Sequence, residues 1–208
     1  MADVRIESIA DPFSEDDPEL GEAFLDVLLR ADSMGLISED VRGLDRKALR
    51  AVGKAVAEQG IGQAQAVETL TAAKLPRARL LDVLEQWKDA LEESPIPSRE
   101  LPALIDLFGL EELAALLDTS PSSLRRYASG QRSAPDVIAA RAHFLSGVVG
   151  DLRGAYNEFG VRRWFVRERS ALGGRSPKKI LRKGWDPDSS DVREVRDLAR
   201  SLVASPAT

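Results

Sequence analysis

The chain has 208 residues, a length that accommodates one or two domains with cores of their own. It contains no cysteine and a single histidine, His143, which excludes disulfides, thiolate metal sites and any cluster that needs two histidines. The net charge is −5, and the chain shows neither an apolar signal segment nor a run near the ~18 apolar residues of a membrane helix, which predicts a cytoplasmic protein without membrane contact.

Charge is distributed unevenly along the chain. Residues 1–98 carry 11 Lys and Arg against 20 Asp and Glu, whereas residues 121–183 carry 14 against 4. Attraction to phosphate depends on where charge lies, so the basic block suits a polyanion despite the acidic total. A block of this kind is equally typical of solvated helix faces, and charge alone does not separate the two interpretations.

The first half of the sequence is typical of an acidic arm followed by a helical bundle. Residues 1–17 are predicted to form a flexible acidic arm, because the alternation at Val4-Arg5-Ile6 is too short for a strand. Trp87, at helical spacing from other apolar residues, is expected to anchor the core. The N-terminal helical domain is predicted over 18–94, with helices over about 18–34, 45–60, 63–74 and 76–93.

Pro95 and Pro97 forbid a continuous helix, so a domain border is predicted at residues 94–97. His143 is expected to be a partly buried structural residue rather than a proton shuttle. No segment other than Val4-Arg5-Ile6 suggests a strand, so the predicted fold is all-α, an N-terminal helical bundle plus a C-terminal helical domain containing a helix-turn-helix. The helices expected beyond the border, apart from that motif, are 98–108, 135–156, 161–169, 177–184 and 190–203.

Residues 109–132 predict the helix-turn-helix itself. Leu113, Leu116 and Leu117 form an apolar stripe that ends at Asp118, a residue that tolerates the left-handed turn conformation better than most. Ser120 followed by proline is a helix start. The second helix is expected to turn Leu124 and Tyr127 inward and to offer hydroxyl and guanidinium groups to a DNA groove. The predicted DNA-binding residues are Ser120, Ser122, Arg125, Arg126, Ser129 and Arg132.

Residues from about Leu110 to Val203, about half of the chain, resemble the Xre/MbcA/ParS antitoxin family. The resemblance rests on Phe159-Gly160 and Trp164, on the run Leu172-Gly173-Gly174-Arg175-Ser176-Pro177, and on the segments between that run and residue 203. Those segments are a short stretch with Ile180 and Leu181, then Gly184, and the closing segment 192–203. The resemblance implies an Xre-like helix-turn-helix region over 98–159 and a toxin-binding-like helical region over 160–203.

What the resemblance implies is an antitoxin that neutralises a cognate toxin, with the NAD-consuming RES type as the candidate, and that represses its own operon. The implied partners are double-stranded operator DNA and the toxin. A homodimer is expected because an operator with two-fold symmetry has two half-sites, and each half-site binds one copy of the DNA-binding helix. The toxin-facing residues carried over by position are Leu172, Gly173, Gly174, Arg175, Ser176, Pro177, Arg193, Arg196 and Arg200.

Two other interpretations remain open from the sequence. The chain is then either a stand-alone helix-turn-helix transcriptional regulator without a toxin, or a protein-interaction module that does not bind DNA. The residues of the Gly173-Gly174-Arg175 turn alone favour an ordinary connection over a phosphate site, because the lysine and glycine pattern of a nucleotide loop is missing. No buried carboxylate pair or nucleophile–base arrangement is recognisable, so neither an enzyme nor a cofactor is expected.

Overall fold

The structure is a computed structural model that describes residue 2 and residues 4–71 and 75–203. The chain divides into two compact units, Met1–Ser94 (unit 1) and Pro95–Thr208 (unit 2). The division falls where two prolines lie close together, and Pro97 occupies the first turn of the next helix, where its missing N–H is not needed. The predicted end of the third helix, residues 72–74, lies outside the described residues.

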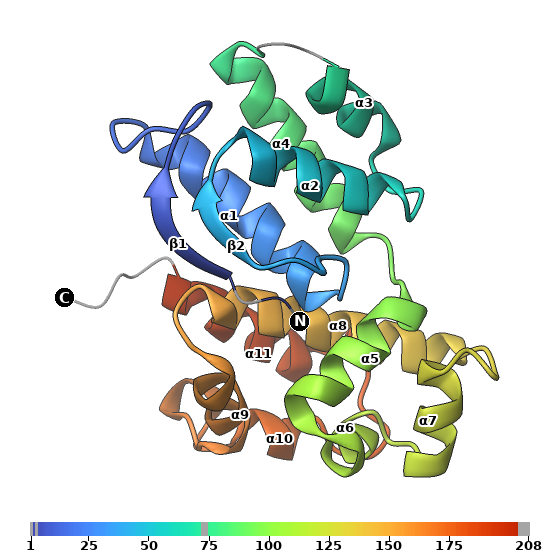
Figure 1. Cartoon of the computed structure of the whole chain (residues 1–208). Coiled ribbons are helices and arrows are strands. Elements are labelled where there is room, and N and C mark those ends of the chain that lie inside the picture. Colours follow the sequence, from blue (N-terminus) through green and yellow to red (C-terminus); the bar gives the residue numbers. More distant parts are fainter. Residues whose placement is uncertain (1, 3, 72–74, 204–208) are drawn as a thin grey trace. The chain divides into compact units, whose positions relative to one another are not determined.

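Most of unit 1 is formed by α1 (Pro18–Ser33), α2 (Arg46–Ala57), α3 (Gln63–Thr71) and α4 (Arg77–Glu92) (Figure 1). α1 packs on α4, and α2 packs on α3. Phe24 and Leu28 of α1 and Leu84 and Trp87 of α4 are fully buried. Unit 1 is therefore mostly helical, and Trp87 is fully buried in its core, as predicted.

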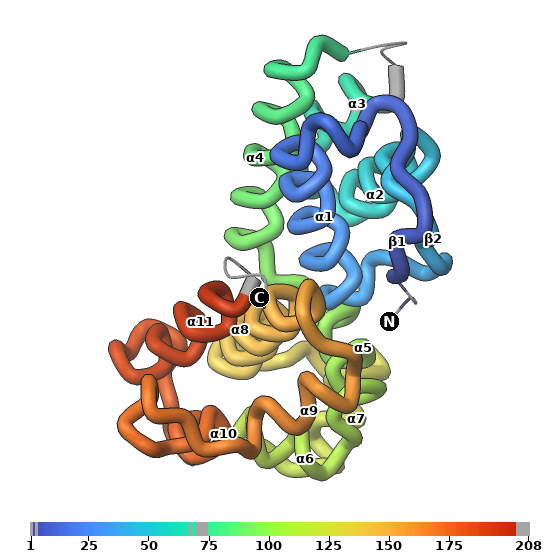
Figure 2. The backbone as a smooth tube through the Cα atoms, turned by 90° about the vertical axis from the view of Figure 1, so that its left-hand side faces the viewer, coloured from blue at the N-terminus to red at the C-terminus, as the bar shows by residue number. Residues whose placement is uncertain are grey.

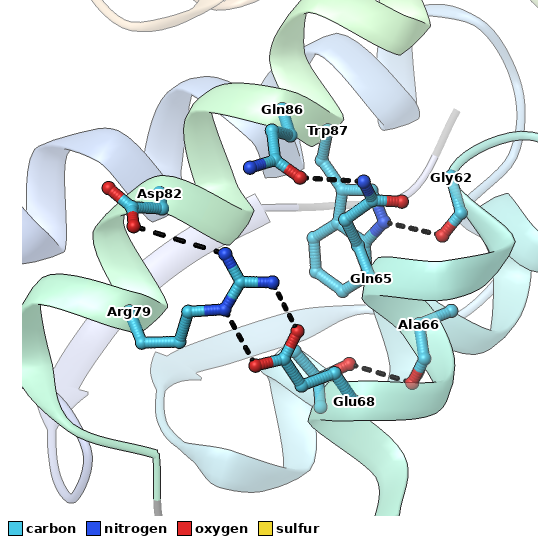
Figure 3. Close-up of polar contacts among 9 residues, drawn as sticks. Gly62, Gln65, Ala66, Glu68, Arg79, Asp82, Gln86 and Trp87 are labelled. Atoms are coloured by element: carbon cyan, nitrogen blue, oxygen red, sulfur yellow. Dashed lines mark hydrogen bonds and ion pairs between the residues drawn. The ribbon is translucent and has the colours of Figure 1, made fainter.

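Two glycines make room for the Trp87 ring between α2 and the loop before α3. The indole N–H donates to the carbonyl oxygen of Gly62, 3.2 Å away (Figure 3). A Cβ added at Gly62 would clash with the ring, and one added at Gly53 would lie only 2.8 Å from it. Gly62 also has a φ of +51°, a conformation that glycine adopts without strain. The close approach of backbone to ring explains why both positions hold glycine.

Polar side chains join α3 to α4 beside this ring (Figure 3). The Arg79 guanidinium donates two hydrogen bonds to the Glu68 carboxylate, at 2.8 and 2.7 Å, and Gln65 donates to Gln86 at 2.7 Å. The hydrogen bonds from Arg79 hold the pKa of the Glu68 carboxyl below its ordinary value. This two-pronged ion pair fixes the position of the shortest helix of the unit.

A parallel two-stranded sheet completes unit 1. β1 (Val4–Ile9) and β2 (Val41–Leu44) run in the same direction, and the first and last residues of one strand face those of the other. Because β1 has six residues and β2 has four, the register shifts between Val4 and Ser8. Helix α1 lies in the connection between the strands, as parallel pairing requires (Figure 1).

The sheet corrects two predictions, the all-α fold and the flexible acidic arm over residues 1–17. The fold is mostly helical but not all-α, and the strand within that segment is paired. The Ala10 N–H extends the pairing by donating to the Leu44 carbonyl at 2.9 Å. The Phe13 ring then stacks on Phe24 of α1 with 4.8 Å between centroids. A short polar strand of this kind is stabilised by a partner distant in sequence, which local alternation does not reveal.

Unit 2 is helical around one long central helix. Its elements are α5 (Pro97–Phe108), α6 (Leu110–Leu116), α7 (Pro121–Ala128), α8 (Asp136–Arg153), α9 (Glu158–Val166), the 3-10 helix η1 (Ser170–Leu172), α10 (Pro177–Ile180) and α11 (Ser190–Val203). α5, α9 and α11 all pack on α8, and Figure 2 shows α11 running beside it. No helix among the described residues has both the length and the apolar character to cross a membrane.

Two helices of unit 2, α9 and α10, have boundaries that differ from the predicted ones. α9 begins earlier than predicted, because the Asn157 side chain caps it by accepting a hydrogen bond from the Gly160 N–H at 2.9 Å. α10 is shorter than predicted: Leu181 already leaves the helical conformation, with φ −79° and ψ 53°. The 3-10 helix η1 was not predicted, since three residues show no period.

Candidate nucleic-acid interface

The turn between α6 and α7 has the geometry that the sequence predicts. Asp118 has a φ of +55° and is the non-glycine residue with positive φ among the described residues. Its neighbour Thr119 donates its N–H back to the Ala114 carbonyl at 2.9 Å, which closes the end of α6. Asp118 therefore takes the left-handed conformation that aspartate tolerates better than most residues, and the turn brings α7 back against the rest of unit 2.

Helix α7 is capped at its start and anchored on its inner face. The Ser120 hydroxyl accepts a hydrogen bond from the Ser123 N–H at 3.1 Å, and Pro121 follows at the first helical position. Leu124 is fully buried and Tyr127 is 8% exposed, as expected for the face that packs on α5 and α6. This packing fixes which face of α7 points outward.

The outward face carries the side chains predicted to contact DNA. Arg125 and Arg126 point to solvent, and within the described part of the chain neither guanidinium forms an ion pair. The Arg132 guanidinium lies over the Tyr127 ring, 5.8 Å from its centroid. All six predicted residues are exposed: Ser120, Ser122, Arg125, Arg126, Ser129 and Arg132.

The serines of this face have hydrogen-bonding partners within the motif. The Ser120 hydroxyl, besides capping α7, lies 3.0 Å from the Ser122 hydroxyl. The Ser129 hydroxyl donates to the Arg126 carbonyl at 3.3 Å. Ser120 therefore has a structural role at the start of α7, and the two arginines are the strongest donors left for a ligand.

A buried arginine ties the turn to the centre of unit 2. Arg141 of α8 is only 6% exposed, and its guanidinium donates to the carbonyls of Leu117 at 3.0 Å and Trp185 at 2.9 Å. It also lies 5.3 Å from the Trp185 ring centroid and 3.8 Å from the Asp118 carboxylate. The nearby Asp118 charge is thus balanced by a cation from inside the unit.

The loop after α10 is held against the same turn. The Trp185 indole N–H donates to the Leu116 carbonyl at 2.7 Å, and the Gly184 N–H donates to the Asp118 carboxylate at 3.1 Å. The sequence patterns singled out neither Trp185 nor Arg141. One signal was present: Arg141 lies three positions after Ile138 and therefore on the apolar face of its helix, where a charged side chain needs a partner.

His143 has a structural partner in the same unit. Its Nδ1 lies 2.6 Å from an Oε1 of Glu100, a residue with no exposed surface, whose other oxygen accepts a hydrogen bond from the Ile96 N–H at 3.1 Å. The pair joins α8 to the start of α5. The partly buried structural position expected for His143 is confirmed.

Three of the predicted toxin-facing residues are buried, which corrects their assignment. Leu172 is 1% exposed and packs in the core, and Pro177 is buried at the first position of α10. The Ser176 hydroxyl caps that helix by accepting from the Lys179 N–H at 3.3 Å. Gly173 and Gly174, with φ of +63° and +76°, and Arg175 form the exposed part of the turn. The motif thus specifies a turn whose flanks are structural.

The arginines predicted to face a toxin on α11 all have carboxylate partners. Arg193 pairs with Asp188 at 3.4 Å, and Arg196 and Arg200 approach Asp151 of α8 at 3.5 and 3.6 Å. In the turn, Arg175 donates to Asp191 at 3.0 Å and lowers the pKa of that carboxyl. Arg193, Arg200 and Arg175 are exposed, whereas Arg196 is half-buried. Their charges are balanced within unit 2, unlike those of Arg125 and Arg126.

Comparison with known proteins finds no relative. No family model matches the chain, and no curated protein and no solved structure matches it significantly. The resemblance to the Xre/MbcA/ParS antitoxins therefore stays a prediction from sequence motifs.

Proposed function

We propose that unit 2 binds double-stranded DNA, with α7 entering the major groove and α6 bracing it. The observation that carries this proposal is the contrast between the two faces of α7. Leu124 and Tyr127 are packed inside, while Arg125 and Arg126 stand outside without a carboxylate partner in the described chain. Helix-turn-helix proteins place the second helix in the groove with its outward side chains on base edges and phosphates.

The chemistry of this face suits DNA better than a protein partner. A guanidinium can donate two hydrogen bonds to the acceptors of a guanine edge or to a phosphate, and serine hydroxyls donate or accept at either. An arginine that forms no ion pair within the protein breaks none when it binds a polyanion. Its binding to phosphate releases counterions from the DNA, which favours association. Arg132, exposed just beyond α7, adds a third guanidinium to this surface.

The test compares the full chain with its Arg125→Ala/Arg126→Ala variant on a duplex of its own promoter, by fluorescence anisotropy. If each guanidinium contributes about 1 kcal/mol or more, the dissociation constant rises at least roughly 30-fold. The matched control is Arg163→Ala/Arg167→Ala, which removes the same charge from exposed positions on α9 and its end. Equal affinity of wild type and the Arg125/Arg126 variant rejects the assignment of α7 as the DNA-reading helix.

A protein partner is the second part of the proposal, favoured by an apolar strip on α9. Phe159 is 64% exposed and Val166 is 54% exposed, and a spacing of seven residues puts them on one helix face. They lie in or beside the region that resembles the toxin-binding part of the antitoxins. We infer that this strip, with the exposed Gly173-Gly174-Arg175 turn, is where a toxin binds and that the complex, as a dimer, represses its own operon.

Co-expression separates this second part from its alternatives. The product of an adjacent gene is expected to arrest growth alone and to be neutralised by the wild-type chain but not by Phe159→Ser/Val166→Ser. DNA binding by that variant is expected to be unchanged, because neither side chain is charged and both lie outside the helix-turn-helix. A harmless neighbour with intact promoter binding supports a stand-alone regulator, and absence of promoter binding supports an interaction module.

A further inference from the structure

A short basic segment from the C-terminal part of unit 2 lies beside the turn of the helix-turn-helix. Arg182 and Lys183 precede Gly184, whose N–H donates to the Asp118 carboxylate at 3.1 Å. The next residue, Trp185, is tied to the end of α6 through its indole N–H. Consecutive Cα atoms are about 3.8 Å apart, so both basic residues lie within two such steps of a residue bonded to the turn.

The charges of Arg182 and Lys183 are not neutralised, in contrast to those of the lysines before them. Lys178 pairs with Glu112 at 2.8 Å, and Lys179 pairs with Glu168 at 2.5 Å. Arg182 and Lys183 are exposed, and their side chains have no carboxylate partner within the described residues. Two cations that need not break an ion pair to bind a ligand therefore lie near the start of α7.

The surface around them is hollowed. An open groove of about 400 Å³ runs between α6 and α10, with Leu116 and Leu181 among its apolar residues and with Arg182 and Lys183 as its unpaired cations among the described residues. Figure 1 shows α10 next to α6, on the side of α6 away from α7. When α7 lies in the major groove of a duplex, one DNA backbone passes the start of that helix. Each strand carries one phosphate for every 3.4 Å along the duplex axis.

We propose that Arg182 and Lys183 bind backbone phosphates next to the N-terminal end of α7 and so extend the DNA-binding surface beyond the helix-turn-helix. This inference rests on the proposed function. Contacts to phosphate position a protein on the duplex without reading bases. The two residues are therefore expected to raise affinity for every duplex alike, while Arg125 and Arg126 discriminate between sequences. The hydrogen bonds from Gly184 and Trp185 hold the segment in place beside the turn.

The experiment measures affinity over a range of salt concentrations for the full chain and for Arg182→Ala/Lys183→Ala, on the promoter duplex and on an unrelated duplex. The slope of log affinity against log salt is negative, and each phosphate contact contributes about −0.9 to it. Losing two contacts therefore makes the slope less steep by about 1.8. Between 50 and 200 mM salt, wild-type affinity is then expected to fall about 12-fold more than that of the variant. The loss at low salt is expected to be the same factor on both duplexes.

The controls make each outcome decisive. Arg163→Ala/Arg167→Ala removes two exposed charges from α9 and its end, and is expected to keep the wild-type slope. An unchanged slope in Arg182→Ala/Lys183→Ala, with promoter binding still lost in Arg125→Ala/Arg126→Ala, overturns this inference and leaves the proposed function standing. If neither double variant changes DNA binding, the proposed function fails first.

A protein occupant of the groove is the competing explanation, and the same variant tests it. Should Arg182→Ala/Lys183→Ala lose the protein partner in a co-purification while keeping the wild-type salt slope, the segment binds protein and the phosphate assignment is overturned. Thermal unfolding of the variant at the wild-type temperature is expected, because both side chains are exposed, and it shows that any loss of binding is not loss of fold.

Discussion

Replacing the buried Arg141 with methionine is expected to destabilise unit 2 strongly. The substitution keeps an apolar stem of similar length but removes the guanidinium. The carbonyls of Leu117 and Trp185 lose their donor, at 3.0 and 2.9 Å, and the Asp118 carboxylate loses the cation 3.8 Å away. Hydrogen bonds from a charged donor contribute about 1.5–3 kcal/mol each, so the two carbonyls alone account for about 3–6 kcal/mol.

Part of this loss is offset, because methionine carries no charge and its burial avoids the desolvation cost of a guanidinium. The net effect is therefore expected at the lower end, about 3 kcal/mol. For a unit of this size each kcal/mol moves Tm by about 4 °C, which gives a fall of about 12 °C. Thermal unfolding followed by far-UV circular dichroism and by tryptophan fluorescence measures it, since Trp185 contacts the substituted side chain.

Arg163→Met is the matched control, because that arginine is exposed on α9. A surface substitution of this kind is expected to shift Tm by no more than about 2 °C. If Arg141→Met behaves like this control, the buried network does not stabilise unit 2 and the reasoning is refuted. A large fall with Arg141→Met alone places the stabilisation in the guanidinium.

Two further predictions concern unit 1. Gly62→Ala drives a methyl group into the Trp87 ring, whereas Gly60→Ala, also at positive φ, meets nothing within 4 Å. Gly62→Ala is therefore expected to lower the free energy of unfolding by about 1–3 kcal/mol more than Gly60→Ala, as measured by thermal or urea unfolding. Equal losses in the two variants would contradict the packing argument. The hydrogen bonds from Arg79 lower the pKa of Glu68 below its ordinary value of 4.5, so the pair stabilises the fold above that pH and the contribution is lost as pH falls through the lower folded-state pKa. The Tm difference between wild type and Glu68→Gln is expected to be largest near neutral pH and to shrink on acidification, and a difference independent of pH would refute the pair.

Much of the fold was readable from short-range patterns. Apolar residues at helical spacing predicted the helices of both units, and the inward positions of Leu124 and Tyr127 followed from the same period. The capping role of Ser120 and the left-handed Asp118 were also local properties, each decided within a few residues. The exposed positions of Ser122, Arg125 and Arg126 follow from these features, since a helix with one buried face must expose the other.

The features that sequence reasoning missed depend on residues far apart in the chain. The apolar alternation in β1 is too short to be recognised alone, and the strand exists because β2 pairs with it after an intervening helix. The burial of Leu172, Ser176 and Pro177 was decided by the residues that pack around the turn, and not by the motif that contains them.

By itself the sequence determined where the helices lie, which face of α7 is buried and where positive charge is concentrated, because period, capping and composition act within a few residues. Only the tertiary structure decided which of those charges are neutralised and which remain available. Arg175 and the α11 arginines meet carboxylates, whereas Arg125 and Arg126 meet none in the described chain. Pairing between distant side chains is a property of packing, and the proposed division between structural and DNA-binding arginines rests on it.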